Sequence, residues 1–216
     1  MKKVNKEYES ISKTTIRRYS ERFKTFQHNI KTLGWGSKEM QEYRFKKAIE
    51  KVDITNKTIL DIGCGFGDLY NYLRKEKYDF LDYIGWDINK DLIKNTLINE
   101  EKVKLEIVDI ALQKPKKEVA SIGFMFGLLN WKLDSEEKNY QYSIDLIESA
   151  FNAVSETLIV DFLSTNYYEG YPIEDFVFYH DPAIMIKRVN QLTCNFELIH
   201  NYKPIPQKEF MLILHK

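Results

Sequence analysis

The sequence of 216 residues has only two cysteines, Cys64 and Cys194, and no long apolar run. Two cysteines cannot build a disulfide framework or a cysteine-rich zinc site, so we expect a chain that works in a reducing cytoplasm. The longest apolar stretch, 122–129, has eight residues even when its two glycines are counted. A membrane-spanning helix needs about 18 or more, and no apolar segment follows the lysines at the start. We therefore expect neither a membrane span nor export.

The chain has as many acidic as basic residues, 32 of each, but they are unevenly distributed. Residues 1–50 carry 13 lysines and arginines against 6 acidic residues, and the rest of the chain carries the compensating negative charge. A long solvated helix would explain this asymmetry, and so would a basic cap over a site for an anionic substrate. Both explanations stay open at the level of the sequence.

Apolar residues recur at every third or fourth position early in the chain, which predicts a helix at about 5–29 and a second one that Ser37 caps. Further on, seven short apolar runs predict strands at 58–62, 80–87, 103–108, 119–126, 157–162, 195–200 and 210–215. Helical patterns separate most of these strands, at 67–75, 90–100, 136–154 and from 181 onward.

Strands that alternate with helices predict an α/β fold with a Rossmann-like, doubly wound, seven-stranded sheet that is mostly parallel. Only residues 203–208 join the last two strands, so these should pair as an antiparallel hairpin and give the sheet one antiparallel edge strand. We expect residues 1–36 to form an N-terminal helical cap and residues 37–216 to form a single domain.

Three of the nine glycines, Gly63, Gly65 and Gly67, stand in the segment ILDIGCGFGD, directly after the first predicted strand. Glycine admits positive φ and lets a ligand touch the main chain, so a strand that ends in such a turn and leads into a helix predicts a nucleoside-binding crevice. Asp87 ends the next predicted strand about 20 residues further on, where a carboxylate can hydrogen-bond a ribose diol. The alternative is that Asp87 only caps the helix that follows.

The turn does not match the dinucleotide motif GxGxxG, because Asp68 or Tyr70 stands where the last glycine belongs. An aspartate at the start of the helix would also repel a pyrophosphate. Asp61 and Asp68 would instead favour a ligand that is positively charged near the turn. S-adenosylmethionine, which carries an ammonium and a sulfonium, is therefore predicted as the cofactor rather than NAD.

The segments ILDIGCGFGDLYNYL, GWDINKDLI, VDIAL and FMLILHK resemble successive motifs of class I S-adenosylmethionine-dependent methyltransferases, over about residues 37–216. The N-terminal segment YSERFKTFQHNIKTLGWGSKEMQEYRF, together with VDFLS and YHDP, is similar to a group of small bacterial methyltransferases of unassigned acceptor. The resemblance implies that Asp61 and the turn holding Gly63, Cys64, Gly65 and Gly67 bind the methionine end.

The same resemblance implies a set of contacts around the rest of the cofactor, whose product after transfer would be S-adenosylhomocysteine. Asp87 would hold the ribose and Ile88 would pack on the adenine. Asp109 and Ile110 would lie beside the adenine amino group. Phe126 and Gly127, at the end of the fourth predicted strand, would border the sulfonium.

The acceptor is expected between the N-terminal helices and the loops after the fourth and fifth predicted strands. Asn130 could orient it or be a turn asparagine, and His180 could be a general base or only pack beside the next helix. Trp35 could face the sulfonium or fill the space beneath the helical cap. The predicted acceptor contacts are Tyr19, Arg22, Asn130, Tyr167 and Tyr168, with Arg17, Arg18, Arg22 and Arg44 as candidates for an anionic group.

The predicted activity is methyl transfer to an oxygen or nitrogen of a small molecule such as a metabolite, sugar or natural product. An RNA or other nucleic-acid methyltransferase is an alternative, although the sequence has GLLN rather than an NPPY-type motif after the fourth strand and has no Pro-Cys pair. A non-catalytic cofactor-binding partner protein and a dehydrogenase are further alternatives. The histidines show no shared spacing with carboxylates, so we expect no metal site. The balanced total charge offers little attraction for phosphates, so we expect no DNA partner, and the short apolar runs predict no membrane partner. The oligomeric state is left open.

Overall fold

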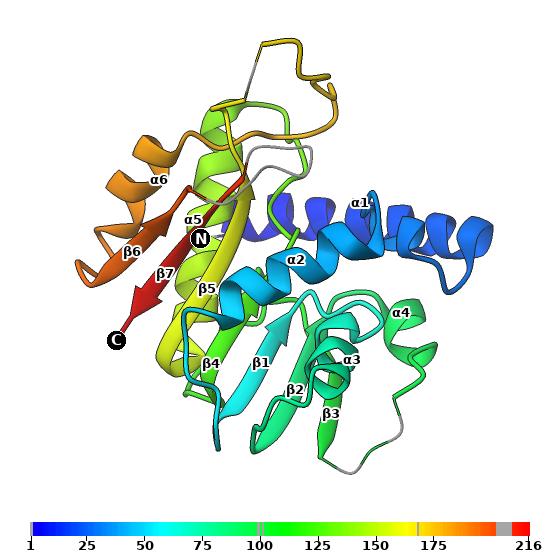
Figure 1. Ribbon diagram of the computed structural model, residues 1–216. Coiled ribbons are helices and arrows are strands. Elements are labelled where there is room, and N and C mark those ends of the chain that lie inside the picture. The colour runs from blue at the N-terminus through cyan, green and yellow to red at the C-terminus, as the bar shows by residue number, and fades with distance from the viewer. Residues whose placement is uncertain (1, 99, 101, 168, 202–208) are drawn as a thin grey trace.

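The computed structural model describes residues 2–98, 100, 102–167, 169–201 and 209–216, and Figure 1 shows their arrangement. Seven strands form one sheet in the order β3-β2-β1-β4-β5-β7-β6, in which all pairs from β3 to β5 are parallel and β7 runs antiparallel to both of its neighbours. The strands are β1 (Thr58–Ile62), β2 (Asp82–Asp87), β3 (Val103–Ile107), β4 (Ala120–Met125), β5 (Val154–Leu163), β6 (Phe196–Ile199) and β7 (Glu209–His215).

This sheet confirms the predicted fold class, a mostly parallel seven-stranded α/β sheet with an antiparallel hairpin at one edge. The antiparallel strand, β7, lies one position inside the edge, which β6 occupies. The connection predicted at 203–208 lies outside the described residues. Strand β1 has β2 on one side and β4 on the other, so the strand order reverses direction there. In open α/β sheets, ligands bind beyond the carboxyl ends of the strands at such a switch point.

Most helices begin where capping side chains predict that they should. The hydroxyl of Ser37 accepts a hydrogen bond from the backbone N–H of Met40, and Asp181 caps the helix that begins with Pro182. The helices are α1 (Lys2–Phe26), the short 3₁₀ helix η1 (Ile30–Leu33), α2 (Lys38–Ile49), α3 (Asp68–Lys75), α4 (Lys90–Lys94), α5 (Glu136–Asn152) and α6 (Pro182–Val189).

The helix predicted at 90–100 is wrong beyond Lys94, where α4 ends. The next residues leave the helix and cover the glycine turn instead. The hydroxyl of Thr96 donates to the carbonyl of Phe66 at 3.0 Å, and the side chain of Ile98 lies against Gly67. A tertiary contact has therefore overridden the helical pattern of the sequence.

Both faces of the sheet are buried, as expected for parallel strands. Alternate residues of β1 face opposite ways, so Ile59 packs in the cluster formed with α2 and α3, whereas Leu60 and Ile62 pack in the cluster formed with α5 and α6. Figure 1 shows α2 and α3 in front of the sheet and α5 behind it. The carboxyl end of β1 is thereby held between two packed layers.

Helix α1 lies across the carboxyl ends of the parallel strands (Figure 1). Hydrogen bonds fix it to the loop after β2 and to α4: the amide of Asn89 donates to the carbonyl of Ile16 at 3.0 Å, and the hydroxyl of Ser20 donates to Asp91 at 2.6 Å. Tyr8 donates to Asp145 of α5. The N-terminal helix thus forms a roof over the sheet end where a ligand would bind.

A buried arginine joins α2 to the centre of the sheet. Arg44 is 3% exposed, pairs with the carboxylate of Glu209 in β7, and lies 3.7 Å from a carboxylate oxygen of Asp161 in β5. It also donates to the carbonyl of Met40 at 2.8 Å. Burying these charges is tolerated only because they face one another.

Replacing Arg44 with Met should therefore destabilise the protein by about 3–5 kcal/mol, because two buried carboxylates lose their cation. Urea unfolding followed by circular dichroism measures this loss. The matched control is Lys47→Met on the same helix, where an exposed pair with Glu50 is removed and little change is expected. Equal, small effects of the two substitutions would contradict the structural role of Arg44.

Candidate functional site

A cavity of about 680 Å³ opens between α1 and the carboxyl ends of the parallel strands. Its volume is within the range of roughly 300–1,000 Å³ that is usual for small-molecule sites. Residues after β1, β2, β3 and β4 line one side, and residues of α1, α2 and the loops after β4 and β5 line the other. The cavity thus lies at the topological switch point, where the sequence placed the ligand.

The turn after β1 is held by the end of β2. The backbone N–H groups of Gly63 and Cys64 both donate to the carbonyl of Trp86, at 2.7 and 3.0 Å. Gly63, Gly65 and Gly67 have φ values of +79°, +56° and +80°, which other residues rarely adopt. Conformation alone therefore requires glycine at these three positions.

Close packing is a second reason for glycine at these positions. The sequence predicts that a ligand occupies the space beside them. A Cβ atom on Gly63 would stand 2.8 Å from Leu128, one on Gly65 would stand 2.9 Å from Leu33, and one on Gly67 would stand 2.3 Å from Ile98. The protein's own side chains therefore fill the space beside all three glycines. Gly63, Cys64 and Gly65 still line the cavity with their other surfaces, whereas Gly67 does not. The predicted cofactor contact at Gly67 is wrong, because this residue starts α3 beneath Ile98.

Asp87 sits at the end of β2 and is buried at the edge of the cavity. One carboxylate oxygen accepts the N–H of Gly65 at 2.9 Å, and the other accepts the N–H of Asn89 at 2.7 Å. A carboxylate has about four acceptor positions, so each oxygen keeps one that a diol can use. Burial raises the pKa of Asp87 to about 6.

Asp61 lies in β1 and is also buried beside the cavity. Its carboxylate accepts the hydroxyl of Tyr83. The pKa of Asp61 is raised to about 7, chiefly by burial and also by the nearby carboxylates of Asp87 and Asp68, although the hydrogen bond from Tyr83 opposes the change. Its charged form is therefore disfavoured near neutral pH.

Neither Asp61 nor Asp87 has a lysine, arginine or histidine within ion-pair distance among the described residues. Buried carboxylates are usually paired, and strongly perturbed pKa values in a cleft are a mark of functional sites. The arrangement suits a ligand that brings positive charge and hydroxyl donors to this end of the cavity.

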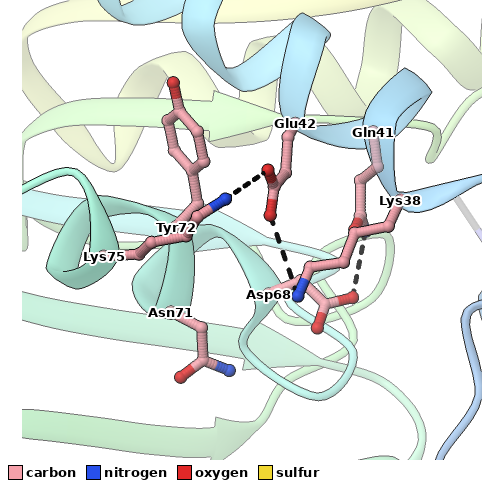
Figure 2. Close-up of a pocket in the computed structure, with 7 residues that line it drawn as sticks. All are labelled: Lys38, Gln41, Glu42, Asp68, Asn71, Tyr72 and Lys75. Carbon is pink, nitrogen blue, oxygen red and sulfur yellow. Dashed lines mark hydrogen bonds and ion pairs between the residues drawn. The ribbon is translucent and has the colours of Figure 1, made fainter.

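Asp68, at the start of α3, lines the same cavity and accepts the amide of Gln41 at 3.0 Å. Figure 2 shows this contact beside a second hollow between α2 and α3, where Lys75 pairs with Glu42 at 2.8 Å. This hollow measures only about 70 Å³, which leaves room for a few waters. We therefore place the candidate site in the larger cavity.

The residues predicted to border an adenine lie together along the cavity. Ile88, Asp109 and Ile110 all line it, after β2 and after β3. Asp109 accepts the N–H of Ala111 at 3.1 Å, which closes a turn and holds its side chain in place. The contacts of these residues with a cofactor stay a prediction.

The residues predicted to border a sulfonium also meet. Phe126, Gly127 and Trp35 line the cavity, and the ring of Trp35 lies about 3.0 Å from where a Cβ on Gly127 would stand. The N–H of Gly127 donates to Asp161 at 2.7 Å. Trp35 therefore both fills the space beneath α1 and faces the cavity, so its two interpretations are compatible.

Three of the predicted acceptor contacts, Tyr19, Arg22 and Asn130, line the cavity. Burial raises the pKa of Tyr19. The guanidinium of Arg22 donates to the carbonyls of Lys31 and Thr32, so it holds η1 as well as facing the cavity. The amide oxygen of Asn130 accepts the N–H of Leu163 at 3.3 Å, which leaves its amide N–H groups to orient an acceptor.

His180 does not reach the cavity, so its predicted role as a general base is wrong. Its side chain is 0% exposed and packs against Phe162 and Phe178, and its Nε2 lies 3.0 Å from the hydroxyl of Ser143. Burial lowers the pKa of His180 to about 3, because the charged imidazolium loses its contact with water. An isolated parallel β-bridge between Ser164 and His180 holds the backbone of His180 beside the end of β5.

The aromatic loop after β5 contributes different residues from those predicted. Tyr167 is exposed, packs against Tyr171 and Tyr179, and is not among the residues that line the cavity, so its acceptor contact stays a prediction. Tyr168 lies outside the described residues. Phe176 and Val177 line the cavity instead.

Sequence reasoning missed Asp161 and Tyr142. Asp161 was visible as a lone carboxylate within the apolar strand TLIVDF, which marks a buried acid with a partner. Burial raises its pKa to about 6 while Arg44 opposes the change. Tyr142 lines the cavity from α5, and burial together with the carboxylate of Asp109 raises its pKa. It lies off the apolar stripe of its helix, so no pattern in the sequence indicated it.

Solved structures with the same architecture decide the fold. Magnesium protoporphyrin IX methyltransferase from Synechocystis PCC 6803, solved with bound S-adenosylhomocysteine, superposes with a TM-score of 0.63 at 12% identity, covering 99% of each chain. A SAM-dependent methyltransferase from Archaeoglobus fulgidus matches with a TM-score of 0.62 at 14% identity, covering 84% of this chain and 95% of the other. The fold is that of the class I S-adenosylmethionine-dependent methyltransferases.

A third match with this methyltransferase fold is the pyocyanin biosynthetic protein PhzM, with a TM-score of 0.55 at 14% identity, covering 80% of this chain and 54% of the other. At identities this low, a structural match establishes the fold alone. No family model and no curated protein sequence matches the chain.

Two further properties concern the described part of the chain. No helix there has both the length and the apolar character that crossing a bilayer requires. Nor do three or more His, Cys, Asp or Glu side chains gather there in a way that could hold a metal ion.

The raised pKa of Asp61 predicts an unusual pH dependence of stability. Because its folded pKa of about 7 exceeds the ordinary value of 3.8, the favourable contribution of this group is complete below about pH 4 and is lost as the pH rises through 7. Asp61→Asn keeps an acceptor for Tyr83 and has no charge to bury. At pH 8 it should stabilise the ligand-free protein by up to about 4 kcal/mol, because each pH unit between 3.8 and about 7 corresponds to about 1.4 kcal/mol, and at pH 4.5 by much less.

Urea unfolding of wild type and Asp61→Asn at both pH values measures this difference. Asp82→Asn, at the exposed start of β2, is the control and should change stability little at either pH. If Asp61→Asn and wild type were equally stable at pH 8, the charge of Asp61 would not be costly to bury.

Proposed function

We propose that this protein is an S-adenosylmethionine-dependent methyltransferase that acts on an oxygen or nitrogen of a small molecule. The observation that carries the proposal is the pair of buried carboxylates, Asp61 and Asp87, which face a cavity of about 680 Å³ without a cationic partner among the described residues. A cofactor with an ammonium, a sulfonium and a ribose diol supplies the charge and the donors that these groups lack.

The chemistry of the donor set fits each part of the cofactor. Asp87 keeps acceptor positions for two ribose hydroxyls while it holds Gly65 and Asn89. Asp61 and Asp68 place two carboxyl groups near the turn, and a bound ammonium would stabilise the charged form of Asp61. Ile88 and Ile110 offer apolar surface for an adenine. A dinucleotide is less suitable, because these carboxylates would repel its pyrophosphate.

When bound, S-adenosylmethionine supplies a methyl group on a positively charged sulfur, and transfer leaves S-adenosylhomocysteine while the acceptor loses one proton. The residues of this chain contribute position and exclusion of water. Helix α1 roofs the cavity, and Trp35, Phe126 and Leu128 give it apolar walls. Holding two reactants in line can contribute about 7–11 kcal/mol to lowering a barrier, so the reaction does not require the base that His180 fails to provide.

A small acceptor is supported by the enclosure of the cavity. The same helix that roofs it is tied to the sheet domain by Tyr8, Ser20 and Asn89. A polynucleotide would have to displace this roof or insert a single base beneath it. Among the structural matches, one is named a magnesium protoporphyrin IX methyltransferase and another a pyocyanin biosynthetic protein. Both names refer to small molecules, which supports a small acceptor here.

Asp87→Ala should weaken the binding of S-adenosylhomocysteine by roughly 1–3 kcal/mol, or about 5- to 150-fold, because hydrogen bonds to a charged group are lost. Calorimetric titration measures the affinity. Asp82→Ala, at the exposed start of the same strand, is the matched control and should bind as wild type does. Unchanged affinity in Asp87→Ala would remove Asp87 from the site.

Methyl-labelled S-adenosylmethionine, incubated with the wild-type protein and fractionated cell extract, tests the acceptor class. Label should appear in the small-molecule fraction and should fall with Asp87→Ala. Label in the RNA fraction would favour the nucleic-acid alternative, and cofactor binding with no labelled product in any fraction would favour a non-catalytic partner protein.

A further inference from the structure

The half of the cavity that lies away from the cofactor residues is apolar and aromatic, with one charged group at its side. Leu163 at the end of β5, and Leu129, Trp131, Phe176 and Val177 from the loops after β4 and β5, line it. Arg18 enters the same space from α1, where it contacts Trp131. Arg22, one turn further along α1, also lines the cavity.

Arg18 is stacked on an aromatic ring and is half-buried. Its guanidinium carbon lies 3.2 Å from the centroid of the Trp131 ring and 5.5 Å from that of Phe176. Stacking uses the faces of the planar guanidinium and leaves the N–H groups at its edge free to donate. Burial lowers the pKa of Arg18, and the charge of Arg22 lowers it further while Tyr19 opposes the change.

Among the described residues, Arg18 makes no hydrogen bond or ion pair with any carboxylate or carbonyl, which sets it apart from the other two cavity arginines. Arg22 donates to the carbonyls of Lys31 and Thr32, and Arg44 pairs with Glu209. Glu174 lines the cavity too, and it forms no ion pair with Arg18 among the described residues. A half-buried cation with open donors calls for an anionic partner.

We propose, resting on the proposed function, that Arg18 anchors a carboxylate on an apolar, aromatic acceptor, held edge-on to the guanidinium while the acceptor body packs between Trp131 and Leu163. The carboxylate anchors the acceptor and does not itself receive the methyl group, because pairing with a guanidinium lowers the reactivity of its oxygens as nucleophiles. The hydroxyl or amine that is methylated therefore lies elsewhere on the acceptor.

A carboxylate fits better than a phosphate for two reasons. The guanidinium presents a flat, two-point donor edge, and one cation balances one negative charge in an apolar surrounding. A phosphate would bring a second charge near pH 7, and Arg22 already directs two of its donors to backbone carbonyls. Glu174 at the rim adds a further charge that would repel a dianion.

The test titrates wild-type protein, with and without saturating S-adenosylhomocysteine, with three aryl carboxylates of increasing size and with their uncharged amides. The probes are 4-hydroxybenzoate, 4-hydroxyphenylacetate and indole-3-acetate, each beside its primary amide, together with 4-hydroxyphenyl phosphate. At least one carboxylate should bind ten times or more tightly than its amide and more tightly than the phosphate. No preference for any carboxylate over its amide, or a preference for the phosphate, would overturn the proposal.

Arg18→Gln should weaken the binding of the preferred carboxylate by about 10- to 100-fold and leave the binding of its amide unchanged. Arg18→Lys keeps the charge but not the two-point geometry, so an intermediate loss is expected. Arg17→Gln is the matched control, because Arg17 is the neighbouring residue on α1, is exposed and lies outside the cavity. It should bind every probe as wild type does.

Two measurements distinguish a failure of the anchor role from a failure of the proposed function and from a folding defect. Thermal unfolding and S-adenosylhomocysteine affinity should be the same in Arg18→Gln, Arg17→Gln and wild type. If S-adenosylhomocysteine does not bind wild type at all, the proposed function fails, while the titrations without it still report on Arg18. Equal loss of carboxylate and amide binding in Arg18→Gln would show that the residue only shapes the cavity, and would overturn the anchor role.

Discussion

The whole site depends on two carboxylates that are kept out of water without a balancing cation among the residues that the structure describes. Asp61 lies near the end of β1 and Asp87 ends the neighbouring parallel strand β2, and the register of β1 against β2 fixes their separation. Tyr83 and the backbone N–H groups of Gly65 and Asn89 hold them in place, but hydrogen bonds do not remove the cost of burying charge. The buried carboxylates lower the free energy of unfolding relative to a neutral core, and a bound cationic nucleoside would raise it again. Groups that reduce stability in this way are common at functional sites.

Much of this arrangement could be predicted from the sequence, because its determinants are local. TILDI followed by closely spaced glycines specifies a buried strand and a turn with positive φ, and the structure has both at the predicted residues. Asp87 lies at the end of the next strand because the chain between them has the length of one crossover helix. The residue at which a parallel strand ends, and the number of residues to the next strand, can therefore be predicted from the sequence.

The wrong predictions concern contacts between distant segments. His180 was chosen for its chemistry and its place before a helix, but the bridge to Ser164 buries it. Gly67 was taken as a ligand contact, whereas Ile98, more than thirty residues away in sequence, occupies the space beside it. Arg18 was one of four arginine candidates, and only the structure distinguishes it, through its stacking on Trp131 and through the partners that Arg22 and Arg44 already have. Which side chain meets which partner is decided by tertiary packing, and no local pattern reports it.

The most direct test of the central claim is a crystal structure of the protein with S-adenosylhomocysteine. The ribose hydroxyl oxygens should lie within hydrogen-bond distance of both carboxylate oxygens of Asp87, with the homocysteine end beside Asp61 and the turn at Gly63 and Gly65. Electron density for the nucleoside at another place, or a cavity without ligand at saturating concentration, would contradict the account.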